Sequence, residues 1–551
     1  MNLKKCVLCG IMASSLTIPF SGTAFMAPAS ENAGTIQNTS IAEAAQMAKT
    51  YNLDFDSNKN YTEESMNLDG ETVKYRAYRN VVYVAHPKSV ASESMNIFIP
   101  AAYFENGTVN GYTKETAPIF MPNGVGGYMP GKAGEPQEKA PRSDRANAVL
   151  TALSKGYVVA APAIRGRTTI GDDGKTYVGK APAFIVDYKA AVRYLRHNKK
   201  NLPAGDTEKI ISNGTSAGGA LSALLGATGN VKEYEPYLKE IGAANERDDI
   251  FASSVYCPIT NLEHADMAYE WMFNGVNSYY MAMWQLQDLA NRGMKVPGEK
   301  SSDKSAVRQP KALDADAANN PNASKQKIDM TKEEIAVSKV LKDAFPAYLN
   351  SLQLKDENGI LLTLDKNGKG SFRDYIKGKY MQSAQDALSR GLDVFSAKWV
   401  KVKNGKVVDV DLDAYPAAAT RMKAAPAFDK LDLSSAENDE FGTEANVPKH
   451  FSAISKQYES KQGEMADPEM IKLINPLNFI GNGKATVAKH YRIRHGAIDR
   501  DTALAIPAIL ALTLQNNGID VNFYSPWNRG HSGDYDLPEL FNWMDSICKA
   551  K

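Results

Sequence analysis

Residues 211–220 read Ile211-Ser212-Asn213-Gly214-Thr215-Ser216-Ala217-Gly218-Gly219-Ala220 and hold a Gly-x-Ser-x-Gly pentapeptide from Gly214 to Gly218. The apolar pair 210–211 precedes it, as in a buried strand, and the Leu- and Ala-rich stretch 220–225 follows it, as in a buried helix. A strand, a sharp turn and a helix are the context in which this motif forms a nucleophile elbow. The bare pentapeptide is expected by chance about 0.2 times in a chain of this length. The prediction that Ser216 is a nucleophile therefore depends largely on the apolar residues on both sides of the motif.

Apolar strands and amphipathic helices alternate on both sides of this motif. Such alternation predicts the α/β class, with a mostly parallel sheet and helices on both of its faces. The helix expected over 184–196 shows a 3.6-residue apolar stripe typical of a helix that lies on a sheet. The strand-like runs are 72–78, 81–85, 95–99, 117–121, 156–163, 209–212, 254–257, 491–494 and 521–524, and the other helical runs are 147–153, 503–516 and a last one from about residue 538.

A glycine-rich loop, Pro122-Asn-Gly-Val-Gly-Gly-Tyr128, directly follows the strand expected at 117–121. In an esterase sheet this is the place of the second backbone donor to the oxyanion, and the first donor is the amide after the nucleophile, here Ala217. Gly126 or Gly127 is therefore the candidate for the second donor. The alternative is an ordinary flexible turn.

The alternation of strands and helices stops after residue 260 and returns near residue 486. We therefore predict a catalytic core formed by residues 50–260 and 486–551, with residues 261–485 as a lid or insertion domain. A hairpin is expected within the insertion, at 399–410, because Asn404-Gly405 favours a type I′ turn. Residues 365–370 resemble a calcium-binding loop only weakly, since Lys369 stands at a ligand position, and they are read as a turn.

The composition describes a globular chain with almost no net charge. Lys and Arg number 64 against 63 Asp and Glu, and 43% of the 551 residues are hydrophobic. No basic stripe or acidic tail points to nucleic acid or to a strongly charged partner.

The N-terminus has the pattern of a secretory signal peptide. Two lysines precede an apolar run over 6–20, and small residues follow it up to Ala24. We therefore expect residues 1–24 to be a signal peptide and the mature protein to be secreted, periplasmic or cell-surface, with no membrane contact after cleavage; an uncleaved anchor is the alternative. Cleavage would leave Cys257 and Cys548, either as one bridge or as two buried thiols.

The remaining parts of a serine hydrolase lie near the C-terminus. A serine needs an imidazole to accept its proton and a carboxylate to orient that imidazole, and in the α/β-hydrolase fold these follow in the order Ser, Asp or Glu, His. Asp499 comes directly after a strand, and His531 lies in the loop Gly-His-Ser-Gly after the last strand. His495 is the rival base but precedes the acid, and the other histidines are read as surface or structural. Asp501 is the rival acid, which could otherwise face the substrate or cap a helix near Thr502.

Three blocks together resemble the bacterial tannases, secreted serine esterases that hydrolyse gallate esters. The blocks are the Gly-Thr-Ser-Ala-Gly-Gly elbow, His-Gly-x-x-Asp-Arg-Asp at 495–501 and Gly-His-Ser-Gly-Asp-Tyr-Asp at 530–536. The resemblance runs from about residue 72 to the C-terminus and includes the insertion. It implies an α/β-hydrolase fold with a lid, and it places the family's serine, acid and base on Ser216, Asp499 and His531.

The resemblance also implies a pocket for the galloyl group. The family's aspartate, lysine and glutamate for the ring hydroxyls match Asp501, Lys423 and Glu437, and one apolar wall matches Ile259. The opposite wall, a proline in the family, falls on Ala436. Independently of the family, two acceptors and a donor suit three adjacent phenol hydroxyls; the alternative for Lys423 and Glu437 is a solvated surface pair.

The leading interpretation is a secreted serine esterase that hydrolyses galloyl esters of tannins, with a small-molecule galloyl or phenolic ester as substrate and without a metal or cofactor. The alternatives are a broader carboxylesterase or feruloyl esterase on the same fold, and a catalytically dead hydrolase fold that binds polyphenols. Neither the oligomeric state nor the preferred ester size follows from the sequence.

Overall fold

The computed structural model describes residues 50–140, 144–282, 286, 289 and 325–550. The expected signal peptide and a long polar stretch at 299–324 lie outside these residues. No helix within them is both long enough and apolar enough to cross a membrane.

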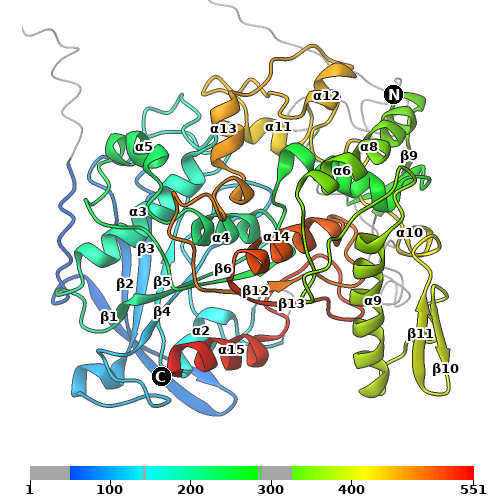
Figure 1. The fold of residues 1–551 in the computed structure, drawn as a ribbon. Helices are drawn as coiled ribbons and strands as arrows, with labels where there is room; N and C mark the ends of the chain where they lie inside the picture. The colour runs from blue at the N-terminus through cyan, green and yellow to red at the C-terminus, as the bar shows by residue number, and fades with distance from the viewer. Residues whose placement is uncertain (1–49, 141–143, 283–285, 287–288, 290–324, 551) are drawn as a thin grey trace, which may run out of the picture. The chain divides into compact units, whose positions relative to one another are not determined.

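One nine-stranded sheet forms the centre of the protein, in the order β1-β2-β3-β5-β4-β6-β7-β12-β13 (Figure 1). From β5 to β13 all neighbouring strands run parallel, whereas β1, β2 and β3 form an antiparallel edge. The mostly parallel sheet predicted from the sequence is confirmed. The strands are β1 Tyr61–Leu68, β2 Glu71–Val82, β3 Ser94–Pro100, β4 Pro118–Pro122, β5 Val158–Pro162, β6 Asp206–Thr215, β7 Ala252–Tyr256, β12 His490–Arg494 and β13 Asp520–Tyr524.

Helices cover both faces of this sheet. Figure 1 shows α3, α4 and α14 on one side of the sheet, and α2 and α15 on the other. The central strands β5 and β7 are buried along their whole length, as expected when helices lie on both faces. These helices are α2 Ala148–Ser154, α3 Ala183–His197, α4 Ala217–Ala227, α14 Ala505–Asn516 and α15 Leu537–Lys549.

Helix α3 is buried on all sides and not only along the apolar stripe seen in the sequence. Its charged residues are compensated within the protein: Lys189 and Arg193 both pair with Asp248, and Asp187 binds Arg165 at 2.6 Å. A buried charge is tolerated only when it is paired and hydrogen-bonded, so the polar face of α3 joins the helix to its neighbours.

The chain leaves the sheet after β7 and returns at β12. None of the strands described between them joins the sheet: β8 with β9, and β10 with β11, form separate two-stranded pairs. The second pair is the expected hairpin, and its turn at residues 404–405 has positive φ at both positions. The elements of this segment are α6 Leu262–Phe273, β8 Ser278–Ala282, β9 Lys325–Asp329, α8 Lys332–Ser351, α9 Ser371–Ser389, β10 Val400–Lys403, β11 Lys406–Val410, α10 Tyr415–Ala419, α11 Ala436–Glu440, α12 Ala453–Gln457 and α13 Pro468–Leu473.

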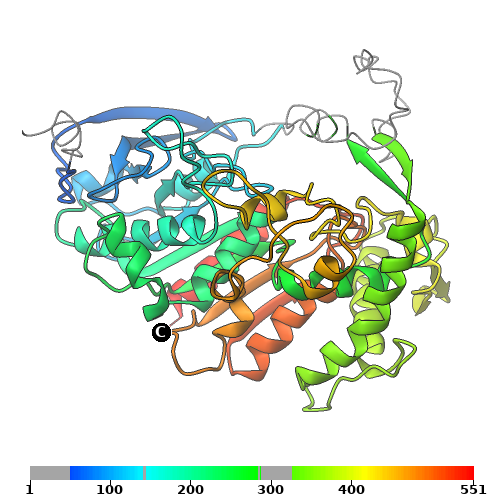
Figure 2. The same ribbon diagram turned by 90° about the horizontal axis from the view of Figure 1, so that it is seen from above.

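This segment packs beside the carboxyl edge of the sheet in both ribbon views (Figure 2). Helix α6 connects it to the core, because it contacts both α8 and α14. The domain boundaries at 261 and 485, and a lid role for the segment, stay predictions.

Several local expectations were refined. Strand β1 was not expected, and residues 81–82 continue β2 after an irregularity in register instead of starting a new strand. Residues 365–370 form a turn, as expected, in which the Asp365 carboxylate accepts backbone N–H groups of Asn367 and Lys369. Cys257 and Cys548 are both free and buried, which decides the alternative left open by the sequence.

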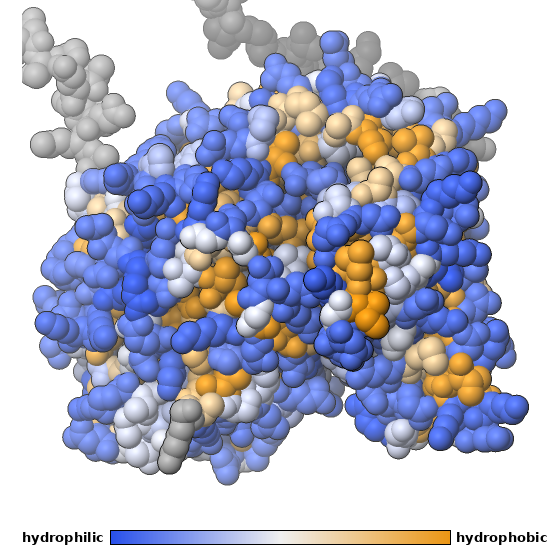
Figure 3. Space-filling model, viewed as in Figure 1, coloured by the Kyte–Doolittle hydropathy of each residue, from blue (hydrophilic) through white to orange (hydrophobic). Residues whose placement is uncertain are grey.

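The face of the protein in Figure 3 is largely hydrophilic, with apolar side chains in separate small patches. Most buried apolar residues form one core that runs through the sheet and its helices, and two smaller clusters lie within segment 261–485.

Candidate active site

The turn between β6 and α4 carries Ser216 in a strained conformation, with φ 60° and ψ −122°. A non-glycine residue is rarely found at positive φ, and the tight turn requires glycines nearby that have no side chain. A Cβ on Gly214 would lie 2.2 Å from the carbonyl oxygen of Gly218, and one on Gly219 would lie 2.5 Å from that of Tyr256. The pentapeptide therefore forms the elbow that the sequence predicts.

The structure brings the three predicted catalytic side chains together in one chain of hydrogen bonds. The Ser216 hydroxyl donates to Nε2 of His531 over 2.8 Å, and Nδ1 of His531 donates to Oδ2 of Asp499 over 2.9 Å. Oδ1 of Asp499 accepts the backbone N–H groups of Asp501 and Thr502. The carboxylate is thus fixed by the loop after β12, and it orients the imidazole so that Nε2 faces the serine.

The electrostatics of the Asp499–His531 pair favour the charged form of the Asp499 carboxylate. Asp499 is almost fully buried; burial disfavours its charged form, but His531 and His495 outweigh burial and lower the pKa of Asp499. In His531, burial favours the neutral ring, whereas the Asp499 charge raises its pKa well above 6.5. The neutral imidazole that a base requires is therefore favoured by higher pH.

The rival base, His495, occupies a different position. It is fully buried, its Nε2 donates to the carbonyl oxygen of Thr502 over 3.0 Å, and burial lowers its pKa. The rival acid, Asp501, offers its backbone N–H to Asp499 instead of a carboxylate to His531. Nor does Asp501 cap a helix, because α14 begins at Ala505 with Leu504 as its N-cap and no side-chain cap. The geometry thus favours the order Ser216, Asp499, His531.

The glycine-rich loop after β4 lies against the elbow. The Asn123 amide donates to the carbonyl oxygens of Asn213 and Gly218, and its Oδ1 accepts the N–H of Val125. Gly126 and Gly127 follow as exposed residues, and among the described residues nothing accepts a hydrogen bond from their N–H groups. Ala217 is the first residue of α4, where an N–H has no intrahelical partner. The expected oxyanion donors therefore lie on two segments that Asn123 joins.

Asp501 and Lys423, two of the residues assigned to the galloyl pocket, lie on segments that are joined through α6. The Tyr269 hydroxyl on α6 donates to the carbonyl oxygen of Arg500 and accepts the N–H of Met422, so it joins the neighbours of Asp501 to those of Lys423. The Lys423 ammonium lies 4.2 Å from the centre of the Phe428 ring.

Glu437 and Ile259 are buried, with 6% and 4% of their surface exposed. No hydrogen bond to the Glu437 carboxylate is found within the described residues. Because so little of Glu437 is exposed, a solvated surface pair does not fit its position.

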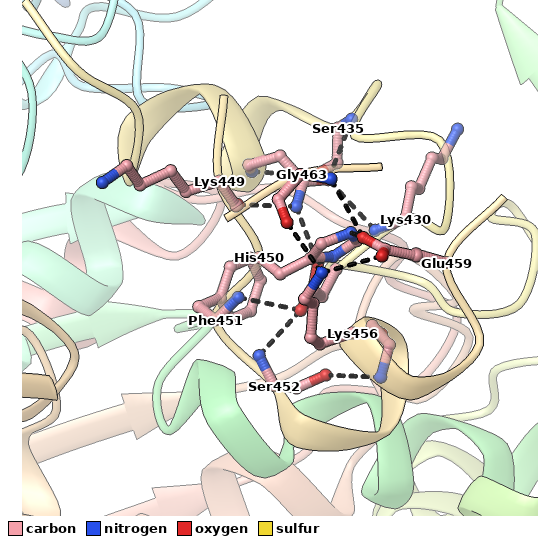
Figure 4. A network of polar contacts seen from close by, with 12 residues as sticks. Lys430, Ser435, Lys449, His450, Phe451, Ser452, Lys456, Glu459 and Gly463 are labelled. Atoms are coloured by element: carbon pink, nitrogen blue, oxygen red, sulfur yellow. Dashed lines mark hydrogen bonds and ion pairs between the residues drawn. The ribbon is translucent and has the colours of Figure 1, made fainter. Parts of the chain in front are cut away.

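A buried polar network holds the short helix that carries Glu437 (Figure 4). The Asn438 amide donates to Asp429, and its Oδ1 accepts the hydroxyl of Ser435, the N-cap of α11. Asp429 also accepts from Nδ1 of His450 and from the N–H groups of 451 and 452. His450, read as surface or structural from the sequence, thus has a structural place in this network.

Sequence reasoning missed several residues at the site. Cys257 follows β7 with a φ of 38°, and its sulfur lies 4.0 Å from Nε2 of His531 and 3.6 Å from the carbonyl oxygen of Ser532. Burial raises the pKa of the Cys257 thiol, which keeps it protonated. Asn123 and Arg167, which hold the glycine-rich loop, were missed as well. Asn123 and Arg167 reach their partners only when the strands lie in their final order. The Asn-Gly sequence of the loop was therefore the only local sign of these contacts.

Cys257, Asp499 and His531 are also the one group within the described residues that could supply three metal ligands, with atoms within 4.8 Å of one another. Two of the three belong to the hydrogen-bonded chain with Ser216, and both nitrogens of His531 are engaged there. The arrangement fits a proton relay, and the absence of a metal site and cofactor stays a prediction.

The protein is similar to solved structures along most of its length. A tannase from Lactobacillus plantarum, in an orthorhombic crystal, is 46% identical, with a TM-score of 0.80 over 90% of this chain and 100% of that one. A Fusobacterium nucleatum tannase is 49% identical over the same shares, with a TM-score of 0.80. The chain belongs to the bacterial tannase family. A tannin acyl hydrolase in complex with ethyl gallate is 45% identical, with a TM-score of 0.79 over 90% and 99% of the two chains.

A protein-family model described as BD-FAE matches residues 126–277, which hold the end of the glycine-rich loop, the elbow and α6. No match was found among curated proteins. Membership of the tannase family identifies the chain as a carboxylic ester hydrolase with the α/β-hydrolase fold, which confirms the enzyme class and fold expected from the sequence.

Proposed function

We propose that this tannase-family protein hydrolyses galloyl esters of tannins to gallic acid and an alcohol, through an acyl-enzyme on Ser216. The observation that carries the proposal is the hydrogen-bonded chain from Ser216 through His531 to the buried Asp499. A related tannin acyl hydrolase was crystallised with ethyl gallate and with 3,4-dihydroxybenzoate, which supports a phenolic acyl group as the ligand.

In the first step, Oγ of Ser216 attacks the ester carbonyl carbon while Nε2 of His531 accepts the hydroxyl proton. The tetrahedral oxyanion is stabilised by the N–H of Ala217 and one N–H of the glycine-rich loop, from Gly126 or Gly127. The imidazolium then gives its proton to the leaving alcohol. In the second half, water attacks the acyl-Ser216 with His531 as base, and gallate and the free serine result.

The acyl group is recognised by Asp501, Lys423 and Glu437, which offer two carboxylates and one ammonium to three neighbouring phenol hydroxyls. The buried Ile259 supplies an apolar wall. A pocket built around buried polar groups discriminates against an acyl group without hydroxyls, because its own groups are then left unpaired. Since these residues include two from segment 261–485, we assign that segment a role in acyl specificity.

The protein is exported in this proposal. Residues 1–24 act as a cleaved signal peptide, and the mature enzyme works outside the cytoplasm or at the cell surface. The substrate is a small phenolic ester, and neither nucleic acid nor membrane is a partner.

Two measurements test the function. Ser216→Ala is expected to abolish hydrolysis of methyl gallate and labelling by a fluorophosphonate, while the binding of gallate and the unfolding temperature stay near those of the wild type. A dead, ligand-binding fold would show no labelling of the wild type at Ser216.

Turnover of methyl gallate against methyl ferulate tests the acyl specificity. We expect a marked preference for the gallate ester. Equal turnover would favour the broader carboxylesterase or feruloyl esterase, because the triad itself treats both esters alike.

A further inference from the structure

One arginine connects the glycine-rich loop to the helix that carries Glu437. Nε of Arg167 donates to the carbonyl oxygen of Gly127 over 3.0 Å, and Nη1 donates to the carboxylate of Asp439 over 2.7 Å. Asp439 lies on α11, two residues after Glu437. The Arg167 and Asp439 side chains are each only 5% exposed. The guanidinium therefore bridges the core and the inserted segment inside the protein.

The loop needs such support because its conformation is unfavourable. Gly127 and Tyr128 are both in the left-handed region, with φ of 54° and 56°, and a residue such as tyrosine adopts it only when its surroundings impose it. The backbone N–H of Arg167 donates to the carbonyl oxygen of Tyr128 over 2.8 Å, so Arg167 holds both of these peptide groups.

Within the core, the glycine-rich loop and the chain at Gly166 and Gly179 are too close together for a side chain. A Cβ on Gly166 would lie 2.4 Å from the carbonyl carbon of Met129, and a Cβ on Gly179 would lie 1.9 Å from the carbonyl oxygen of Gly166. Three stretches of backbone are thus stacked without side chains between them: the glycine-rich loop, the chain at Gly166 and the chain at Gly179.

Core residues that follow Gly179 also hold the other end of the bridge, on α11 of the inserted segment. Lys180 donates to the second carboxylate oxygen of Asp439 over 2.6 Å, and the N–H of Ala181 donates to the carbonyl oxygen of Glu440. Glu440 is fully buried with neither carboxylate oxygen hydrogen-bonded among the described residues, and burial raises its pKa well above 4.5. Burial thus favours the neutral form of Glu440, and it is the carboxylate of Asp439 that contacts both cations.

We propose that Arg167 is a positioning residue for the oxyanion loop and that Asp439 couples the placement of this loop to α11. Pinning the carbonyl oxygen of Gly127 fixes the orientation of the peptide chain that presents the N–H groups of Gly126 and Gly127 to the ester. Helix α11 would thus act in two ways. Glu437 contacts the acyl group, and Asp439 holds, through Arg167, the loop whose N–H group donates to the ester carbonyl oxygen. The inference rests on the proposed oxyanion role of this loop.

The test compares Arg167→Met with Lys180→Met, a matched control. Both remove a buried cation that is hydrogen-bonded to Asp439, but only Arg167 contacts the loop. Loss of a single oxyanion donor lowers kcat by about 10²–10³. A donor that is present but misplaced should lower kcat by less. We therefore expect Arg167→Met to lower kcat about 10- to 100-fold on both an aryl acetate and methyl gallate, with KM within about two-fold. Lys180→Met should keep kcat within about three-fold at a similar loss of unfolding temperature.

The proposal is overturned if Arg167→Met keeps wild-type kcat, or if both variants lose kcat in parallel with stability. Where Arg167→Met does not fold, Arg167→Lys replaces it: lysine keeps the charge beside Asp439 but cannot also bind Gly127, so kcat should still fall at least about ten-fold. A fully active Arg167→Lys would overturn the proposal. Reading kcat on an acetate separates this result from the galloyl assignment, and Ser216→Ala separately tests the esterase mechanism.

Discussion

Replacing Asp499 with asparagine should disable the base without removing it. Oδ1 of Asp499 accepts the N–H groups of Asp501 and Thr502, and Oδ2 accepts Nδ1–H of His531 over 2.9 Å. Asparagine can keep the Oδ1 contacts, but it turns an NH₂ donor toward Nδ1. The imidazole must then carry its proton on Nε2, the nitrogen that faces Ser216, and it can no longer accept the serine proton. The same substitution in a serine protease lowers kcat by about 10⁴, a barrier increase of about 5.4 kcal/mol.

The pH dependence should change as well. Asp499 raises the pKa of His531 well above 6.5, against the effect of burial. Wild-type kcat on an aryl acetate should therefore rise with pH through an apparent pKa above 6.5. Removing the negative charge disfavours the imidazolium, so the residual activity of Asp499→Asn should reach its plateau at lower pH.

The control is Asp501→Asn, measured on the same acetate. This carboxylate makes no contact with His531, so turnover of an ester without ring hydroxyls should stay within about three-fold of the wild type, a change of about 0.65 kcal/mol. Thermal unfolding of both variants checks that the loop stays folded. Equal losses on the acetate would mean that the two acids are assigned in the wrong order, and wild-type turnover by Asp499→Asn would refute the tautomer argument.

Two further predictions concern the acyl pocket. Glu437→Ala and Lys423→Ala each remove a charged hydrogen-bonding group, worth roughly 1.5–3 kcal/mol. The kcat/KM for a gallate ester should therefore fall about 10- to 150-fold, while that for a benzoate ester should barely change. A parallel fall for both esters would show that these two residues only hold the inserted segment in place. Ala436→Pro should fold normally, because residue 436 is the first residue of α11 after an extended Ser435 and proline is favoured at that position. Differential scanning calorimetry should show an unchanged or slightly higher unfolding temperature, and the restored wall should lower KM for gallate esters; a cooperative loss of stability would contradict the reasoning.

The elbow and the core were predictable because they depend on local rules. A tight strand-to-helix turn needs glycine where chains approach closely, and the clashes that a Cβ would create at Gly214 and Gly219 show that these two positions require it. Parallel strands buried on both faces give continuous apolar runs, so most of the sheet was visible. The order of acid and base along the chain then followed from the fold.

The inserted segment was harder to predict, although α8 carried a signal. Thr331 and Glu334 form a capping box, and apolar residues follow at 337, 341, 345 and 349, all buried. Pro346 interrupts this stripe in the sequence yet lies inside the helix. The capping box and the apolar stripe are sufficient to predict a helix, but a proline in the same stretch weakens that prediction.

The supporting contacts of the site could not be predicted, since they join residues far apart in the sequence. Arg167 and Asp439 are separated by 272 residues, and no local periodicity shows that such a pair meets. Cys257 reaches His531 because β7, β12 and β13 lie side by side in parallel. Asn123 binds the elbow only because β4 and β6 are neighbours. Pairing of distant segments is decided by the assembled sheet.

The place of β12 in the sheet governs when the enzyme can first act. This strand lies between β7 and β13 and begins at His490, and the hydrogen bond that arms Ser216 spans 315 residues. During synthesis the elbow is complete long before its base exists, and β7 keeps an unpaired edge until more than two hundred further residues have been made. Such long-range closure makes folding slow. On the proposed mechanism, a ribosome-bound chain therefore carries a serine without its base, and hydrolysis begins only when the final strands have inserted.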